Sequence, residues 1–195
     1  MISNINLPPC IIKLGKEFFR CEFDHKSIDI LEMITQKGFY TIYNEFVYQN
    51  NIHDSLIINL FAVSVYKNHG AFAMQKVKNY LVSNPLISLK YLDEFKAYFK
   101  CLLLDKKVFQ ENLNYINPKA ESLKNSSEFY DFEDSYAISK HFLGWSDTEF
   151  WQASPRKFSF ALFSLAKYEK EKAKFIQKQE TADCIQFLNG IKRLL

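Results

Sequence analysis

The sequence predicts a mainly α-helical protein in which an N-terminal β-hairpin packs on a helical bundle and a small C-terminal helical unit follows. Three observations lead to this class. Glycine and proline are scarce, with five of each in 195 residues, and few chain breakers favour long helices joined by short loops. Apolar residues recur at helical spacing through most of the chain. The exception is the stretch 10–23, where they alternate as in a strand pair.

The hairpin is expected over residues 10–14 and 17–23, with a tight turn at 15–16. A turn of this length places Cys10 directly opposite Cys21. Two interpretations of this pair stay open. The thiols are close enough to form a disulfide, or, as a reducing cytosol favours, both are small buried core residues.

A helical domain over residues 1–116 is expected to back this hairpin. Apolar periodicity predicts helices over 27–36 and 39–48, with Gly38 ending the first. Residues 54–68 are apolar around most of the helix circumference, so they predict the central buried helix. Two further helices complete the domain, one ending before Pro85 and one more beyond it; they are marked by Met74, Val77 and Leu81, and by Leu89, Leu92, Phe95, Phe99 and Leu103.

Residues 117–135 are poor in aliphatic side chains and rich in polar and acidic ones, which is typical of a linker. Within them, acidic residues alternate with Phe129, Tyr130 and Phe132. Such a run is either a docking peptide, whose aromatics enter a groove of a basic partner, or a solvated linker that packs one aromatic on the domain. The second interpretation is favoured.

Residues 136–195 form the predicted C-terminal unit, which contains two helix-start signals. Ser146 followed by Glu149 is a capping box, in which each side chain satisfies a free backbone N–H of the first turn. Ser154 before Pro155 repeats the signal, because proline at the first helical position has no N–H to lose. The sequence therefore predicts a short helix and a longer one that meet at a tight corner.

The longer helix, begun at Pro155, is expected to continue for about twenty residues and to change character along its length. Its first half is apolar, whereas residues 167–178 are rich in lysine and glutamate and are expected to be largely solvated. Residues 184–195 then carry an amphipathic stripe that either docks back on the protein or binds a partner.

The corner also carries a short motif of the form Leu-Gly-x-Ser/Thr-x-x-x-Phe-Trp-x-x-Ser/Thr-Pro-x-x-Phe/Leu, matched by Leu143, Gly144, Ser146, Phe150, Trp151, Ser154, Pro155 and Phe158. This run, within residues 140–166, resembles the small tail assembly chaperones of tailed phages and gene transfer agents. Lys157 departs from the pattern, since such proteins often carry an acidic residue there. The order of elements in residues 10–116 is similar to that of another tail chaperone type of gene transfer agents.

The resemblance implies a protein that binds the tape measure protein, the long helical chain that sets tail length, until tail tube subunits polymerise around it. It also allows a shorter frameshifted product that ends before residue 117. The candidate partner-binding residues are the aromatics of the corner, Phe150, Trp151, Phe158, Phe160 and Phe163. For any one of them a place in the core is the favoured alternative.

A helix-turn-helix DNA-binding regulator is the alternative function, because two helices meet across a short turn at 146–166. A recognition helix must present polar side chains to base edges, yet the second helix offers few, namely Arg156, Lys157, Ser159 and Ser164 in its first ten residues. The net charge of +3, with both signs intermixed, adds no field that favours nucleic acid. We expect no nucleic-acid partner.

Neither a catalytic nor a metal site is expected. The sequence holds no G-x-S-x-G, phosphate-loop or H-E-x-x-H motif. Its four histidines lie far apart in the sequence, and no C-x-x-C pair of cysteines occurs. Cys101 and Cys184 are interpreted as helix core positions, and no cofactor is implied. Residues 1–9 lack the features of a secretory signal, and no apolar run approaches the ~20 residues of a membrane span. A cytoplasmic protein without membrane contact is expected.

Overall fold

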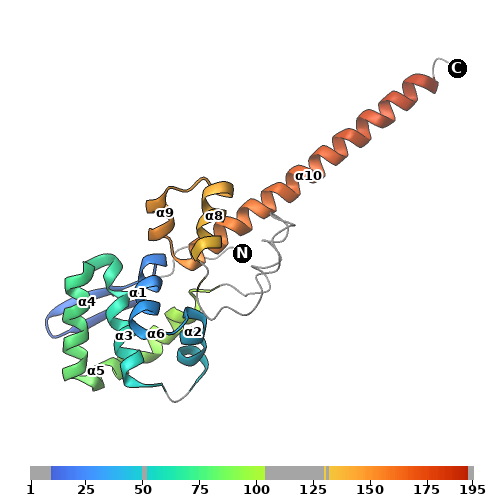
Figure 1. Cartoon of the computed structure of the whole chain (residues 1–195). Helices are drawn as coiled ribbons and strands as arrows, with labels where there is room; N and C mark the ends of the chain where they lie inside the picture. Colours follow the sequence, from blue (N-terminus) through green and yellow to red (C-terminus); the bar gives the residue numbers. More distant parts are fainter. Residues whose placement is uncertain (1–9, 50–51, 104–129, 131, 193–195) are drawn as a thin grey trace.

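The chain folds as a mainly helical protein with an N-terminal two-stranded hairpin, as predicted (Figure 1). The computed structural model describes residues 10–49, 52–103, 130 and 132–192, with the side chains of α10 described as far as Gln177 and at Gln179. The elements in chain order are β1 (Cys10–Leu14), β2 (Glu17–Cys21), α1 (His25–Thr35), α2 (Phe39–Tyr48), α3 (Asp54–Ser64), α4 (Tyr66–Ser83), α5 (Pro85–Lys90), α6 (Leu92–Lys100), α8 (Phe132–Phe142), α9 (Asp147–Gln152) and α10 (Pro155–Lys192).

The hairpin has the predicted register. β1 and β2 are antiparallel, and Cys10 lies opposite Cys21. Gly15 adopts a φ of 62° in the turn, a left-handed conformation that costs glycine little. Both cysteines are buried free thiols, which corresponds to the second interpretation of the pair. Cys101, by contrast, is exposed at the end of α6, so its predicted core position is wrong.

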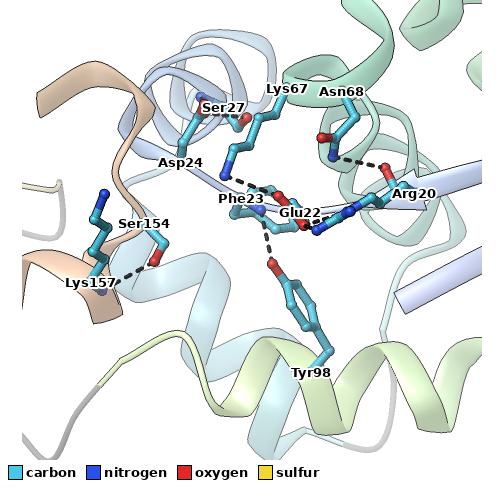
Figure 2. Close-up of polar contacts among 10 residues, drawn as sticks. All are labelled: Arg20, Glu22, Phe23, Asp24, Ser27, Lys67, Asn68, Tyr98, Ser154 and Lys157. Carbon is cyan, nitrogen blue, oxygen red and sulfur yellow. Dashed lines mark hydrogen bonds and ion pairs between the residues drawn. The ribbon is translucent and has the colours of Figure 1, made fainter. Parts of the chain in front are cut away.

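The second strand ends at Cys21, before the predicted end at residue 23, because the backbone turns away to other partners. The N–H of Glu22 donates to the carbonyl oxygen of Ser64 at 2.8 Å. The next N–H, of Phe23, donates to the hydroxyl of Tyr98 at 3.0 Å (Figure 2). These two bonds attach the strand end to α3 and α6.

Side chains cover a backbone position on each strand of the hairpin. On β1, the hydroxyl of Tyr91 accepts from the N–H of Lys13 at 3.2 Å and donates to its carbonyl at 3.3 Å. On β2, the N–H of Arg20 donates to Nε2 of His69 at 3.0 Å, and the Asn68 amide donates to the Arg20 carbonyl at 3.4 Å. Hydrogen bonds of this kind make an edge strand a poorer template for pairing with another chain.

The predicted central helix is α3, whose residues are buried from Leu56 almost without interruption to Ser64. It ends earlier than the predicted residue 68, because the Ser64 carbonyl accepts the Glu22 N–H. Aromatic rings fill the space between α3 and α6. Phe61 stacks on Phe95 with centroids 4.2 Å apart, and their neighbours are Phe23, Phe46 and Phe99.

Three other predicted boundaries differ. The first helix begins earlier than residue 27, at His25, because Asp24 caps it by accepting from the N–H of Ser27 at 2.8 Å. It ends at Thr35, where Gln36 takes the left-handed conformation with a φ of 54°, so the prediction that Gly38 ends it is wrong. The helix expected through residues 89–103 is two helices, α5 and α6, which separate at Tyr91. The helices over Phe39–Tyr48 and up to Ser83, before Pro85, agree with the prediction.

The predicted linker is described only near its end. Residues 117–129 and 131 lie outside the described residues. The expected end of a shorter frameshifted product, just before residue 117, also lies outside them. Residues 132–135 belong to α8, where Glu133 and Asp134 occupy the first turn and complement the positive end of the helix dipole. Tyr130 is buried, with an exposed fraction of 8%. That placement matches the interpretation in which one aromatic packs on the domain.

Beyond α8, the C-terminal unit lies beside α1, and α10 then runs away from the body as one straight helix (Figure 1). It has 38 residues, so the expected length of about twenty is wrong. Its start packs on the protein, with the last buried residue at Ala166. The described side chains between 167 and 177 are mostly exposed, as predicted. The amphipathic stripe expected over 184–195 lies on side chains outside the described ones. In the described part of the chain, no helix has the length and apolar character to cross a membrane.

Candidate partner-binding site

The short helix of the motif begins with the predicted capping box. The N–H of Glu149 donates to Oγ of Ser146 at 3.2 Å, and the N–H of Ser146 donates to Oε2 of Glu149 at 2.7 Å. Gly144, with a φ of 65°, turns the chain from α8 into this start. Both hydrogen bonds fix where α9 begins and therefore where the aromatic side chains of the motif point.

The second predicted start is also confirmed. α10 begins at Pro155, and Oγ of Ser154 accepts from the N–H of Lys157 at 3.1 Å (Figure 2). The corner between α9 and α10 is therefore defined by side-chain caps at both helix starts.

His25 joins this corner to the N-terminal helices. Its buried ring places Nδ1 at 2.8 Å from the carbonyl oxygen of Phe150 and Nε2 at 3.0 Å from the hydroxyl of Tyr130. A carbonyl oxygen only accepts, so Nδ1 carries the proton and Nε2 accepts from the tyrosine. The backbone N–H of His25 donates to Ala153 at 3.0 Å. Burial lowers the pKa of His25 to about 4, which keeps the ring neutral.

Aromatic rings surround the imidazole. Phe150 stacks on it with centroids 4.4 Å apart, and Phe158 meets it edge-on at 5.7 Å. Tyr130 lies at 5.3 Å and Phe132 at 6.4 Å. We call these five side chains the His25 joint. It consists of one neutral polar ring inside an aromatic cluster, drawn from four separate segments of the chain.

Tyr130 is held from a second side by Glu32 of α1. One carboxylate oxygen of Glu32 accepts from the N–H groups of Tyr130 and Phe39, each at 2.7 Å. Burial raises the pKa of this carboxyl above its ordinary value, while the two N–H bonds favour the charged form. The polar groups of Tyr130 are thus bonded through its backbone and through its hydroxyl.

The structure divides the five predicted contact residues into two groups. Phe150 and Phe158 are buried in the His25 joint and present almost no surface to a partner. Trp151, Phe160 and Phe163 are half-buried, so part of each ring reaches solvent. We call these three side chains the aromatic rim. They are the members of the predicted set that remain accessible for binding.

Two rings of the rim carry a cation nearby. Nζ of Lys26 lies 5.5 Å from the centroid of Trp151, and the guanidinium of Arg156 lies 5.1 Å from that of Phe160. A third such pair lies outside the predicted set, with Lys157 5.8 Å from half-buried Trp145. Such pairs hold aromatic rings in place by electrostatic attraction to the ring face. They also make this surface suited to apolar partners that carry carboxylates.

Arg156 additionally ties α10 to the end of α6. Its Nη1 donates to the carbonyl oxygen of Cys101 at 2.9 Å, whereas its Nε is buried without a hydrogen-bond partner among the described residues. The sequence suggested neither this bond nor the His25 joint. Both connect residues far apart in the chain, and neither has a local signal.

No grouping of three or more histidine, cysteine, aspartate or glutamate side chains suited to a metal ion occurs in the described ranges. Comparisons of the chain with models of protein families, with characterised proteins and with solved structures find no match.

Proposed function

We propose that this chain is a tail assembly chaperone of a phage or prophage-like particle, acting in the host cytoplasm. It binds the tape measure protein through the aromatic rim and releases it to the growing tail tube, without catalysis. The observation that carries the proposal is the division of the motif's aromatics. Phe150 and Phe158 anchor the corner, while Trp151, Phe160 and Phe163 keep exposed ring surface beside it.

The chemistry of the rim suits a helical partner. Large, rigid aromatic side chains supply contact area at low entropic cost and are enriched where proteins bind one another. An amphipathic helix recognises such a surface by its apolar stripe. Lys26 and Arg156 lie beside the rings and favour acidic residues at the edges of that stripe.

A small rim also supports release. The predicted set offers three half-buried rings, so the rim by itself supplies a small contact area. Interfaces well below the usual size for stable complexes tend to be transient. A chaperone that polymerising tube subunits must displace requires modest affinity of this kind.

DNA binding has less support. Three polar residues at the start of α10 already have partners. The Arg156 guanidinium donates to the carbonyl oxygen of Cys101, and the Lys157 ammonium lies near the ring of Trp145. Ser159 is buried, and its hydroxyl donates to the carbonyl oxygen of Pro155. Few side chains are therefore left to read base edges. Duplex binding that weakens steeply with salt would favour this alternative instead.

The proposal predicts a gene for a long helical tape measure protein beside this one, and it is tested by co-expressing that protein with the chain. We expect the tape measure protein to aggregate alone, to stay soluble with the full chain, and to co-purify with it. Replacing both Phe160 and Phe163 by serine removes the rescue, whereas Phe72→Ser on α4, at a ring that is 85% exposed, preserves it. If neither the full chain nor its Phe72→Ser variant keeps the tape measure protein soluble, the proposal is contradicted.

A further inference from the structure

Two cysteine side chains lie side by side on the inward face of the hairpin. Cys10 and Cys21 are Cα partners in the antiparallel pair of β1 and β2, and they are buried, at 2% and 0% exposed. Residues directly opposite each other on two strands project their side chains from the same face of the sheet. The two thiols share a hydrogen bond, so their sulfur atoms are within reach of each other.

The backbone at this pair has the separation that a disulfide needs. Directly opposite residues of an antiparallel pair have Cα atoms about 4.5 or 5.5 Å apart, depending on whether they exchange hydrogen bonds. Disulfides join residues whose Cα atoms lie about 4.4–6.8 Å apart. Both separations fall inside this range. A bond between the sulfurs therefore requires a small approach of the side chains and no change in the register of β1 and β2.

We propose that Cys10 and Cys21 form a reversible disulfide when the chain meets a low-molecular-weight disulfide, and that the hairpin keeps its fold in both states. The structure shows the reduced state, in which both thiols are free. A reducing cytosol maintains this state. Oxidation closes the end of the hairpin that lies away from the turn at Gly15. The pair lies apart from the aromatic rim, so this modification is independent of the proposed function.

Disulfide formation suits this pair better than metal binding does. A structural zinc ion takes four ligands, mainly thiolates and imidazoles. In the part of the chain that the structure describes, no group of three or more histidine, cysteine, aspartate or glutamate side chains could hold a metal ion. The pair therefore lacks the further ligands that zinc requires, whereas a disulfide needs only the two sulfurs.

The oxidation consists of two successive exchanges with a reagent RSSR. The Cys10 thiol loses its proton, and the thiolate attacks one sulfur of the reagent, which forms a mixed disulfide of Cys10 with one RS group and releases RS⁻. The Cys21 thiol then loses its proton and attacks the Cys10 sulfur, which forms the protein disulfide and releases the second RS⁻. Each RS⁻ takes up one of the two protons. Two protein thiols are thus oxidised while one RSSR is reduced to two RSH.

The surroundings of the pair favour Cys10 as the first nucleophile. The hydrogen bond from Cys21 lowers the pKa of Cys10, and the thiolate is the form that attacks a disulfide. The same bond, together with burial, raises the pKa of Cys21. Once Cys10 belongs to the mixed disulfide, its thiolate no longer accepts this bond. One cause of the raised pKa is then removed, and Cys21 acts as the resolving thiol.

Burial makes the exchange slow. Neither thiol is exposed, so the reagent reaches Cys10 only when the end of the hairpin opens locally. The exposed Cys101 is therefore expected to react before the pair does. Cys101→Ser and Cys184→Ser remove competing thiols without changing the hairpin.

Oxidation of the folded full chain carrying these two serine substitutions tests the proposal. The chain is equilibrated with oxidised glutathione, remaining thiols are alkylated in denaturant, and the peptides are mapped by mass spectrometry. We expect peptides linked through Cys10 and Cys21, formed at unchanged helicity and separated again by excess reduced glutathione. Two free thiols after equilibration, a linkage that forms only when urea unfolds the chain, or one that reduced glutathione does not reverse, overturns the proposal.

Thermal unfolding tests whether the hairpin accepts the bond. A disulfide restricts the unfolded chain, so the oxidised protein should melt at least about 3 °C above the reduced one. The matched control carries Cys10→Ala and Cys21→Ala, because buried cysteine behaves as a small apolar residue. Its melting temperature should not respond to the oxidant. An oxidised wild-type hairpin that melts no higher than the reduced one contradicts the proposal that the fold is kept.

Discussion

Nδ1 of His25 lies 2.8 Å from the carbonyl oxygen of Phe150, a residue 125 positions further along the chain. This bond connects the first residue of α1 to the motif helix α9. The opposite ring nitrogen accepts from Tyr130 at 3.0 Å. The aromatic motif at the corner of α9 and α10 therefore attaches the C-terminal unit to the N-terminal helices, and its buried aromatics have a structural role.

Replacing His25 is expected to destabilise the whole protein. His25→Ala removes a fully buried ring and leaves the Phe150 carbonyl and the Tyr130 hydroxyl without that partner. The combined loss of packing and hydrogen bonds lowers the free energy of unfolding by about 2–5 kcal/mol. Urea unfolding measures it. His53→Ala, at an exposed residue before α3 without a side-chain cap bond, serves as the control and is expected to change it little.

The same histidine predicts a loss of stability in mild acid. Its pKa is about 4 in the folded protein, against an ordinary value of 6.5. Below pH 6.5 the unfolded chain takes up a proton that the folded chain excludes until the pH approaches 4, so stability falls through this window. The loss between pH 7 and pH 5 is about 2 kcal/mol. Because other groups also titrate in this pH range, the contribution of His25 is isolated by comparison with His25→Ala. The free energy of unfolding should fall by more in the wild type than in this variant. Equal slopes in the two proteins contradict the assignment.

Glu32 is expected to matter as an acceptor more than as a charge. Glu32→Ala leaves the N–H groups of Tyr130 and Phe39 without their acceptor, at a cost of about 2–3 kcal/mol. Glu32→Gln keeps an acceptor oxygen and costs less. Glu45→Ala removes a surface ion pair with Lys37 and is the matched control, with an expected cost of about 0–1 kcal/mol. Equal stability of the alanine and glutamine variants at position 32 would exclude this role.

The paired thiols of the hairpin are expected to react slowly. Cys10 and Cys21 are both buried, whereas Cys101 is exposed. The hydrogen bond to Cys10, together with burial, raises the pKa of Cys21 and keeps it a thiol. The same bond lowers the pKa of Cys10, so that thiol is protected by its burial and not by its pKa. Pulsed alkylation of the native protein, followed by peptide mapping, should modify Cys101 well before either hairpin cysteine. Early labelling of Cys21 is the contrary result.

The features that the sequence predicted well depend on neighbours in the chain. The opposition of Cys10 and Cys21 follows from the short turn at Gly15, and the start of α9 follows from Ser146 and Glu149. Local turn geometry and capping determine both, so the residue types were sufficient to predict them.

The features that it missed depend on contacts between distant residues. α3 ends at Ser64 because the N–H of Glu22 takes its carbonyl, and nothing near Ser64 in the sequence indicates this. His25 likewise gave no signal of its contacts with Phe150 and Tyr130. The motif's aromatics could be identified from the sequence, but their division into anchors and rim required the packing.

The role of the aromatic rim in binding is measured as the affinity of the purified full chain for the tape measure protein. We expect the variant with serine at both Phe160 and Phe163 to bind at least about tenfold more weakly than the wild type. Its melting temperature should stay close to that of the wild type, and Phe72→Ser should keep full affinity. If the double serine variant binds as tightly as the wild type and Phe72→Ser does too, the rim does not bind the tape measure protein.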